Sequence, residues 1–394
     1  MAKKTHFFKK VTFWFLSAII WLGCIFGVSE IFVRIFKYRA FNEMTFYRFR
    51  QSDPILNHSF IPNSSGRLGS KEFRTVYEIN TFGFRDYNYS FKKPSGVKRI
   101  LVLGDSYVEG HGVNIDESFI KILERRINSR IRELKYKYEV INCGILSYSP
   151  ILEYLQLKEK GLSLDPDLVI LFLDQSDLQD DYVYSKHAIF DNNGKPKAVP
   201  KTGFFVGEPK KHKFFLNRFL LRHSALYVYL NQKLRKIKNK KEKEIKDLIA
   251  FGDIETDRLF FLRENPKDFK IHWSRTASYL RLINGMLKEK KIDFVLVVYP
   301  YAHQVDPYEW ECRSEWGFKK GTLYPKGQYF AAAQEFCNAE GIKFIDLYEA
   351  FKKFKETNGN IKLFYNIDGH WTKRTHEVVA QSLYTRLCAD GFIK

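Results

Sequence analysis

The sequence has 394 residues, of which 45% are hydrophobic and 16% aromatic, so most of the chain can form a buried core and extended disorder is excluded. The formal net charge of +20 fits an anionic membrane face, an acidic polymer or nucleic acid as a partner. Five scattered cysteines, none in a Cys-x-x-Cys pair, indicate neither a disulfide framework nor a zinc site; free buried thiols are the simplest interpretation, with a pair between Cys312 and Cys337 as the alternative.

The N-terminal segment predicts one membrane span. Residues 11–29 form an uncharged run of 19 residues, which as an α-helix is about 28 Å long and close to the thickness of the hydrocarbon core of a bilayer. Four lysines precede the run and three basic residues follow it: Lys3, Lys4, Lys9, Lys10, Arg34, Lys37 and Arg39. The larger number before the run favours a cytoplasmic N-terminus, with the rest of the chain outside the cytoplasm.

Two alternatives to an uncleaved anchor remain for this segment. A cleaved signal peptide has a shorter apolar core and an Ala-x-Ala-like site, which does not follow this run. The WLGC sequence ending at Cys24 is similar to a lipoprotein site, but Trp21 and the apolar residues after the cysteine argue against one. We therefore expect a cytoplasmic basic N-terminus at residues 1–10 and a transmembrane anchor at residues 11–36.

A parallel sheet is predicted beyond the anchor. Residues 37–96 form a lead-in region in which 77–86 (YEINTFGFRD) predicts a short strand and a turn. From Arg99 onward, short apolar runs alternate with helical segments, which is typical of a parallel sheet flanked by helices. The predicted strands are 99–103, 138–142, 168–173, 294–299 and 343–346. With the helical apolar stripe that begins at Phe119, they predict a doubly wound, three-layer α/β/α domain with a five-stranded sheet over residues 97–394.

A long insertion separates the third and fourth predicted strands, at about residues 185–273. Its segment 233–246 (KLRKIKNKKEKEIK) carries eight basic and two acidic residues and predicts a helix with one modest apolar edge. A solvated helical face is the simplest interpretation, and a surface that binds anionic lipid or an acidic polymer is the functional alternative. Nucleic acid is not expected as a partner, because no recognition motif accompanies the charge.

Polar residues gather where the predicted strands end. The first strand runs into Gly-Asp-Ser with Ser106, the second into NCGILSYSP with Gly144, and the third into LDQSDLQDD with Ser176. The segment YNIDGHWT, with Asp368 and His370, precedes the last predicted helix. Because open α/β sheets bind ligands at the carboxyl ends of their strands, we expect these side chains to meet at one edge.

These blocks resemble the SGNH, or GDSL-type, hydrolase superfamily, in the same order and over roughly residues 75–390 with the insertion set aside. The resemblance implies a flavodoxin-like sheet, Ser106 as nucleophile, His370 as general base and Asp368 as its partner. It also implies that the backbone N–H groups of Ser106 and Gly144 face the oxyanion. The chemistry suits these residue types, because a serine hydroxyl needs a neighbouring base, and an imidazole titrates near neutral pH.

The third block departs from the pattern of this superfamily. Its asparagine usually donates to the oxyanion, but Gln175-Ser176-Asp177 stands here, with Ser176 in the asparagine position. A serine hydroxyl is shorter, and losing one such donor costs about 2.7 to 4 kcal/mol in the barrier. Gln175 is a candidate replacement donor, while Ser176 and Gln179 also fit a helix capping box.

The last block departs as well, because one residue rather than two separates Asp368 from His370. This D-x-H-W form resembles membrane-anchored bacterial members of the superfamily, including polysaccharide O-acetylation proteins of the alginate type. The resemblance implies acyl transfer as an alternative to hydrolysis, since the two differ only in whether water or a sugar hydroxyl takes the acyl group.

Other polar residues near these blocks have simpler interpretations. We expect His111 to be a loop histidine, His303 and Trp371 to pack, and Asp105 to support the turn at Ser106. Four acids lie at or near the start of a helix, whose positive end they favour without a metal: Asp174, Asp177, Asp180 and Asp181. Neither a metal nor a cofactor is expected.

The sequence thus predicts a single-pass membrane protein with a serine esterase domain on the periplasmic side, acting on an ester such as an acetylated glycan or a lipid. An O-acetyltransferase of a cell-envelope polysaccharide is the first alternative. A catalytically degenerate, glycan-binding scaffold is the second. The membrane and an ester-bearing substrate are the expected partners.

Overall fold

The computed structural model describes residues 2–36, 49–70, 72–129, 135–200, 269–310, 318–319 and 321–394, with short pieces between 220 and 234. The chain divides into two units, which are described separately. One combines Met1–Tyr47 with Pro209–Phe251, and the other combines Arg48–Glu208 with Gly252–Lys394.

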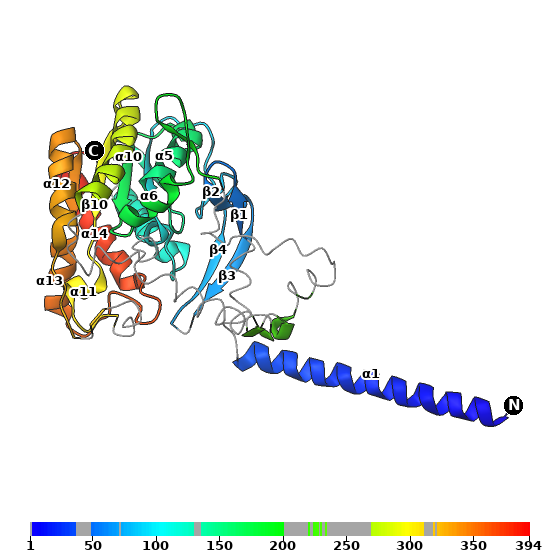
Figure 1. Ribbon diagram of the computed structural model, residues 1–394. Helices are drawn as coiled ribbons and strands as arrows, with labels where there is room; N and C mark the ends of the chain where they lie inside the picture. Colours follow the sequence, from blue (N-terminus) through cyan, green and yellow to red (C-terminus); the bar gives the residue numbers. More distant parts are fainter. Residues whose placement is uncertain are drawn as a thin grey trace. The chain divides into compact units, whose positions relative to one another are not determined.

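The first unit contains one long apolar helix, α1 (Ala2–Phe36) (Figure 1). Its part Thr12–Phe36 is long and apolar enough to cross a membrane, as a single-pass anchor or a signal sequence does. Near its end, Glu30 accepts hydrogen bonds from the Ser224 hydroxyl at 2.8 Å and the Ala225 N–H at 2.7 Å. The start of a helical piece of the insertion therefore contacts α1, whereas the basic residues 235–246 lie outside the described residues.

The second unit is built on a five-stranded parallel sheet, as predicted. Its strands are β5 (Val97–Leu103), β6 (Lys137–Asn142), β7 (Leu168–Leu173), β10 (Asp293–Val298) and β11 (Lys343–Asp346). They lie in the order β11-β10-β7-β5-β6, which is the flavodoxin-like order, and the direction of winding reverses between β5 and β7. All five predicted strands are confirmed; four predicted runs lie within an observed strand, and the run 294–299 extends one residue past the end of β10.

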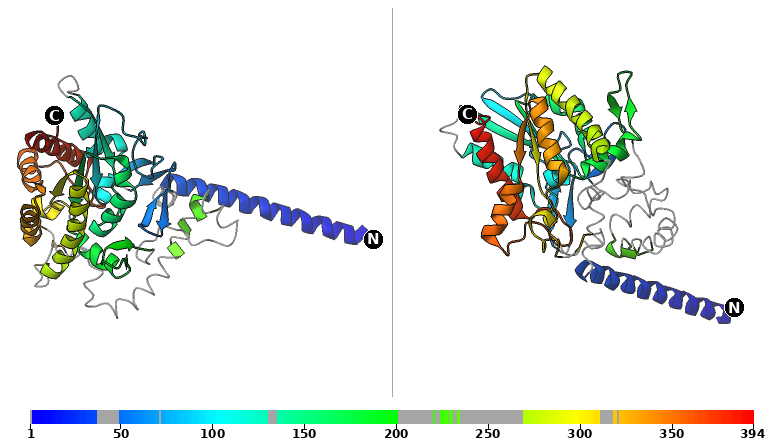
Figure 2. Two further views of the ribbon diagram at one scale, coloured as in Figure 1. Left: turned by 90° about the horizontal axis from the view of Figure 1, so that it is seen from above. Right: turned by 60° about the vertical axis from the view of Figure 1, so that its left-hand side comes forward.

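Helices cover both faces of this sheet, which is why all six residues of β7 are buried (Figure 2). Alternate strand residues, such as Ile100, Val102 and Phe172, join a core cluster with α4 (Phe119–Asn128), α13 (Tyr348–Asn358) and α14 (Lys373–Ala389). On the other face, α10 (Phe269–Glu289) packs against α5 (Pro150–Glu159), α6 (Asp177–Ser185) and α12 (Gly327–Glu340). Of the predicted apolar stripe, Phe119, Leu123 and Ile127 are buried on α4, Ile122 is partly buried, and Ile131 lies outside the described residues.

The lead-in region forms two antiparallel pairs of strands beside this domain. The first pair is β1 (Arg50–Asp53) with β2 (Asn57–Phe60), and the second is β3 (Ser65–Gly69) with β4 (Arg74–Glu78). The strand expected within 77–86 lies earlier, since β4 ends at Glu78 and a turn follows. The remaining elements are α3 (Ser106–Glu109), η2 (Ile115–Glu117), η3 (Gly161–Leu164), β8 (Ile189–Phe190), β9 (Pro196–Ala198) and α11 (Ala302–Val305).

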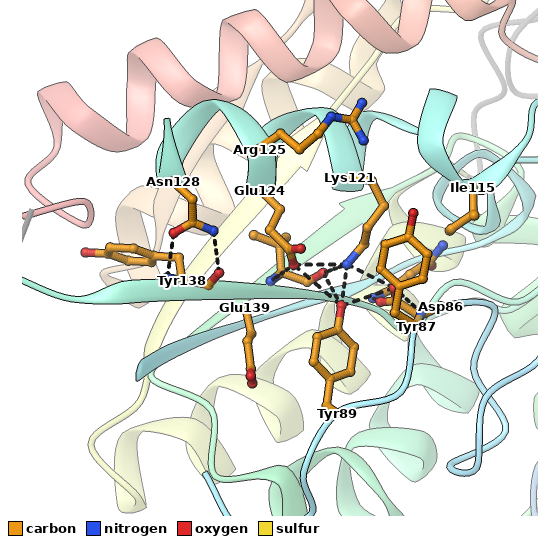
Figure 3. A network of polar contacts seen from close by, with 12 residues as sticks. Asp86, Tyr87, Tyr89, Ile115, Lys121, Glu124, Arg125, Asn128, Tyr138 and Glu139 are labelled. Carbon is orange, nitrogen blue, oxygen red and sulfur yellow. Dashed lines mark hydrogen bonds and ion pairs between the residues drawn. The ribbon is translucent and has the colours of Figure 1, made fainter. Parts of the chain in front are cut away.

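Two consecutive residues of the GFRD segment, Arg85 and Asp86, join the lead-in region to the sheet domain. Arg85 is fully buried and donates to the backbone oxygens of Glu109, Gly110 and Val113, at 3.0, 2.6 and 2.6 Å. Asp86 pairs with Lys121 of α4 at 2.9 Å, and Tyr89 and Glu124 also contact the Lys121 ammonium (Figure 3). These contacts fix the loop after α3 and the amino-terminal half of α4.

Candidate active site

Ser106 is positioned by a tight strand-to-helix turn. It is the first residue of α3, directly after β5, and Asp105 caps this helix by accepting the Tyr107 N–H at 2.9 Å. A Cβ at Gly104 would lie 2.4 Å from the Val108 side chain and 3.3 Å from that of Phe172, so only glycine fits between β5 and α3. The predicted support of the turn by Asp105 is confirmed, and Ser106 lies next to the point where the sheet reverses its winding.

The structure brings Ser106, His370 and Asp368 together. The Nε2 atom of His370 is 2.8 Å from the Ser106 hydroxyl oxygen, and its Nδ1 atom is 2.5 Å from Asp368 Oδ1. The loop that carries both residues is closed by backbone contacts between Tyr365 and His370, and between Phe364 and Trp371. A hydroxyl, an imidazole and a carboxylate are thus hydrogen-bonded in series, although 264 positions separate the first two residues.

The electrostatics of this group favour an ionised acid. Burial alone would raise the pKa of Asp368, but the neighbouring His370 and His111 hold it well below its ordinary value. The side chain of Asp368 is 22% exposed and that of His370 is 19% exposed, so part of this group faces solvent, whereas Ser106 is 5% exposed. A carboxylate that stays ionised can orient the imidazole and stabilise the imidazolium.

Gly144 lies directly against α3. A Cβ at this position would lie 2.3 Å from the Glu109 backbone nitrogen, so a side chain would push the loop after β6 away from the helix. However, the Gly144 N–H donates to the Asn142 side-chain oxygen at 3.0 Å. Sequence reasoning did not identify Asn142, whose side-chain oxygen occupies this donor.

The structure contradicts the helix capping box predicted for the third block. Ser176 precedes α6 but makes no side-chain cap, because it has helical φ and ψ values of −72° and −16° instead of the extended ones typical of a capping residue. Asp174 accepts the Ser176 N–H instead, at 2.6 Å, and the buried Gln179 side chain has no partner among the described residues, so the capping box is wrong. Gln175 is buried, and its side-chain amide donates one hydrogen bond to Gln304 at 2.8 Å within the core.

His111 belongs to the same group as the predicted residues. Its Nε2 atom is 3.5 Å from Asp368 Oδ2, and its ring stacks on that of His370 with centroids 4.2 Å apart. Burial lowers the pKa of His111 below its ordinary value, and so does the neighbouring His370. The sequence placed it correctly in the loop after Ser106, but spacing alone carries no signal for its contact with Asp368.

The other polar residues are structural. His303 stacks on Phe318, and burial lowers its pKa to about 4; Trp371 is fully buried in the core, as expected.

Among the described residues, His111, Asp368 and His370 form the one group of potential metal ligands whose donor atoms lie within 4.8 Å of one another. The carboxylate already faces both rings, so this cluster is explained without an ion. The four described cysteines are free, and Cys312 lies outside the described residues.

Glu109 connects α3 to the lead-in through a buried ion pair. Its carboxylate is 2.5 Å from Arg50 and accepts the Tyr77 hydroxyl at 2.9 Å and the Leu146 N–H at 2.7 Å. Burial alone would raise the pKa of Glu109, but Arg50, His111 and the Leu146 N–H hold it below its ordinary value of 4.5. Because its pKa is lower in the folded state, Glu109 stabilises the fold above pH 4.5, and this contribution is lost as the pH falls through the folded-state pKa.

We therefore expect Glu109→Gln to lower the free energy of unfolding by about 3 kcal/mol near pH 7, since it removes the buried carboxylate that faces the Arg50 guanidinium. The difference between variant and wild type should shrink as the pH falls below 4.5. Urea unfolding of both proteins, followed by circular dichroism at about pH 7 and about pH 4, measures it. A difference that stays constant with pH would contradict the assignment of this stabilisation to the ionised Glu109.

Comparison with known proteins gives structural neighbours only. No protein-family model and no curated protein matches the sequence. The similar solved structures include the acetyl xylan esterase AlAXEase, at 12% identity over 73% of this chain and 99% of that one, with a TM-score of 0.39. They also include TesA (11% identity, 74% and 98% covered, TM-score 0.37) and a lipase/acylhydrolase from Enterococcus faecalis (14%, 75% and 97%, TM-score 0.38). Sequence identities and TM-scores this low carry no information about the chemistry of this chain.

Proposed function

We propose that this chain is an SGNH-type serine hydrolase that cleaves an ester bond. The observation that carries the proposal is the continuous hydrogen-bonded line from the Ser106 hydroxyl through His370 to the ionised Asp368, at the carboxyl edge of a doubly wound sheet. The five-stranded fold and the order of the blocks agree with the superfamily that the sequence resembles.

In the proposed mechanism, His370 Nε2 takes the proton of Ser106 as the hydroxyl oxygen attacks the ester carbonyl carbon. Asp368 stabilises the imidazolium, which then protonates the leaving alcohol as the carbon–oxygen bond of the ester breaks. Water, activated by the same histidine, releases the acid and restores Ser106. The N–H groups of Ser106 and Gly144 are the proposed oxyanion donors, and Gly144 must exchange its bond to Asn142 for the developing charge.

Fluorophosphonate labelling tests this proposal directly. The probe forms a covalent bond with an activated serine, so wild-type protein should be labelled and Ser106→Ala should not. Ser274→Ala, on the exposed side of α10, is the matched control and should be labelled like the wild type. Failure of folded wild-type protein to react with both the probe and p-nitrophenyl acetate would overturn the proposal and favour a catalytically degenerate, glycan-binding scaffold.

The proposed setting is a membrane surface. We propose that residues 1–10 are cytoplasmic, that 11–36 anchor the chain, that 37–96 are a lead-in, and that 97–394 form the hydrolase domain on the periplasmic side, interrupted by an insertion at about 185–273. A periplasmic domain implies an extracytoplasmic ester such as an acetylated glycan or a lipid as substrate. An N-terminal reporter that is accessible from outside the cell would contradict this topology.

O-Acetyl transfer is the second candidate, favoured by the single residue, Gly369, between Asp368 and His370. Gly369 has φ +89°, and a Cβ there would lie 2.3 Å from the Trp310 ring, so the short link needs glycine. Loss of acetyl groups from a cell-surface polymer in a Ser106→Ala strain would indicate transfer, whereas their accumulation would indicate hydrolysis.

Ser176 provides a functional prediction of its own. Its hydroxyl makes no cap and lies at the carboxyl edge of the sheet, where the superfamily has an asparagine donor. We expect Ser176→Asn to raise kcat for p-nitrophenyl acetate by about 10- to 100-fold, because the longer amide adds an oxyanion donor. Ser163→Asn, an exposed change of the same kind, is the control. An unchanged or lower kcat would show that Ser176 does not occupy the donor position.

A further inference from the structure

The loop that carries Asp368 is held by the lead-in region. Glu72 lies in the turn between β3 and β4, almost 300 positions before that loop. Its Oε1 accepts the Asn366 N–H at 2.7 Å, and its Oε2 accepts the N–H groups of Ile367 and Asp368, both at 2.9 Å. One carboxylate therefore binds three successive backbone donors that end at the acid beside His370.

Such an arrangement constrains Asp368 strongly. Hydrogen bonds from backbone N–H groups to a carboxylate are charge-assisted and about twice as strong as neutral ones. The last of these hydrogen bonds is donated by the backbone N–H of Asp368 itself. Glu72 therefore fixes the backbone nitrogen next to the Cα atom that bears the Asp368 side chain. Movement of Glu72 would displace Asp368 relative to His370.

His111 holds the same side chain from the other direction. Asp368 Oδ1 faces His370, while Oδ2 lies 3.5 Å from the Nε2 atom of His111. Phe73, next to Glu72 in the chain, packs its ring edge-on against His111, with centroids 5.5 Å apart and an interplanar angle of 81°. The β3–β4 turn thus contacts both the backbone of Asp368 and the histidine that faces its second oxygen.

We propose that Glu72 and His111 are positioning residues that hold Asp368 in line with His370, Glu72 through the backbone and His111 through the second carboxylate oxygen. The inference rests on the proposed function, since it assigns these residues a role in the same site. It gives the lead-in region a part in catalysis: the β3–β4 turn completes the site that the sheet domain begins.

The test for Glu72 compares Glu72→Gln with Glu78→Gln in the full-length protein. Glutamine keeps the size of the side chain but turns an N–H₂ group towards backbone donors, and Glu78 is an exposed acid on the same hairpin. We expect Glu72→Gln to slow fluorophosphonate labelling of Ser106 by about 10- to 100-fold, while Glu78→Gln labels like the wild type. The low-field proton NMR signal of the His370–Asp368 hydrogen bond should shift or weaken in Glu72→Gln alone, with both variants folded by circular dichroism.

His111 is tested by rescue. His111→Leu removes the donor that faces Asp368 Oδ2 and should lower the labelling rate and shift the same NMR signal, whereas His111→Gln restores an N–H donor and should recover most of both. Wild-type labelling rates and an unchanged NMR signal in Glu72→Gln and His111→Leu would overturn the inference. The two failures are distinguishable: wild-type protein that never reacts with the probe defeats the proposed function, while the NMR signal still reports whether Glu72 and His111 hold Asp368.

Discussion

Replacement of His370 by alanine is expected to lower kcat/KM for p-nitrophenyl acetate by about 10⁴- to 10⁶-fold, with little change in thermal stability. The reason is the 2.8 Å contact between His370 Nε2 and the Ser106 hydroxyl, through which the proton must pass as the serine attacks. Without this base the serine remains a neutral alcohol, which is a poor nucleophile near neutral pH.

A double variant tests whether Ser106 and His370 act in the same step. If Ser106 and His370 act as one unit, the double variant Ser106→Ala/His370→Ala should be no slower than either single variant, because the first change already removes the shared step. His187→Ala, at an exposed loop position, is the control for a histidine loss and should keep wild-type activity. Independent, multiplying effects of the two substitutions would mean that the two side chains do not act in the same step.

The sequence predicted those parts of the structure that depend on local pattern. The central strands β5, β7 and β10 were recoverable because each contains a short apolar run, and burial on both faces of a parallel sheet requires such runs. Ser106, Asp368 and His370 were recoverable because they stand in blocks that resemble a known superfamily. The order of the blocks along the chain placed them at one edge of the sheet.

Contacts between distant loops were not recoverable in the same way. Glu72 meets the 366–368 backbone, and His111 meets Asp368, only after the lead-in has packed on the sheet domain. Nothing in the residues around Glu72 distinguishes it from a surface acid of a hairpin. The capping box at Ser176 failed for the related reason that a nearby acid, Asp174, takes the N–H group that fixes the local backbone.

The second large effect is expected at the buried pair of Asp86 and Lys121 shown in Figure 3. Asp86→Ala should lower the free energy of unfolding by about 3 to 5 kcal/mol, because it removes the buried partner of Lys121, whose side chain is only 1% exposed. Asp86 Oδ2 also accepts the N–H of Asn142 at 2.8 Å, so the substitution loosens the end of β6 just before Gly144. Urea unfolding at neutral pH, followed by circular dichroism, measures the loss.

A double variant separates the net contribution of the Asp86–Lys121 pair to the free energy of unfolding from the destabilisation that follows when only one partner is removed. Burial raises the pKa of Asp86 above its ordinary value even with Lys121 beside it, which shows that desolvation of this carboxylate is expensive. Asp86→Ala/Lys121→Met removes both charges and should therefore be more stable than Asp86→Ala alone. Glu377→Ala breaks a surface pair with Arg374 within α14 and should stay within about 0.5 kcal/mol of the wild type. Equal losses in the buried and exposed single variants would contradict the view that burial of the charge, rather than its presence, sets the energy.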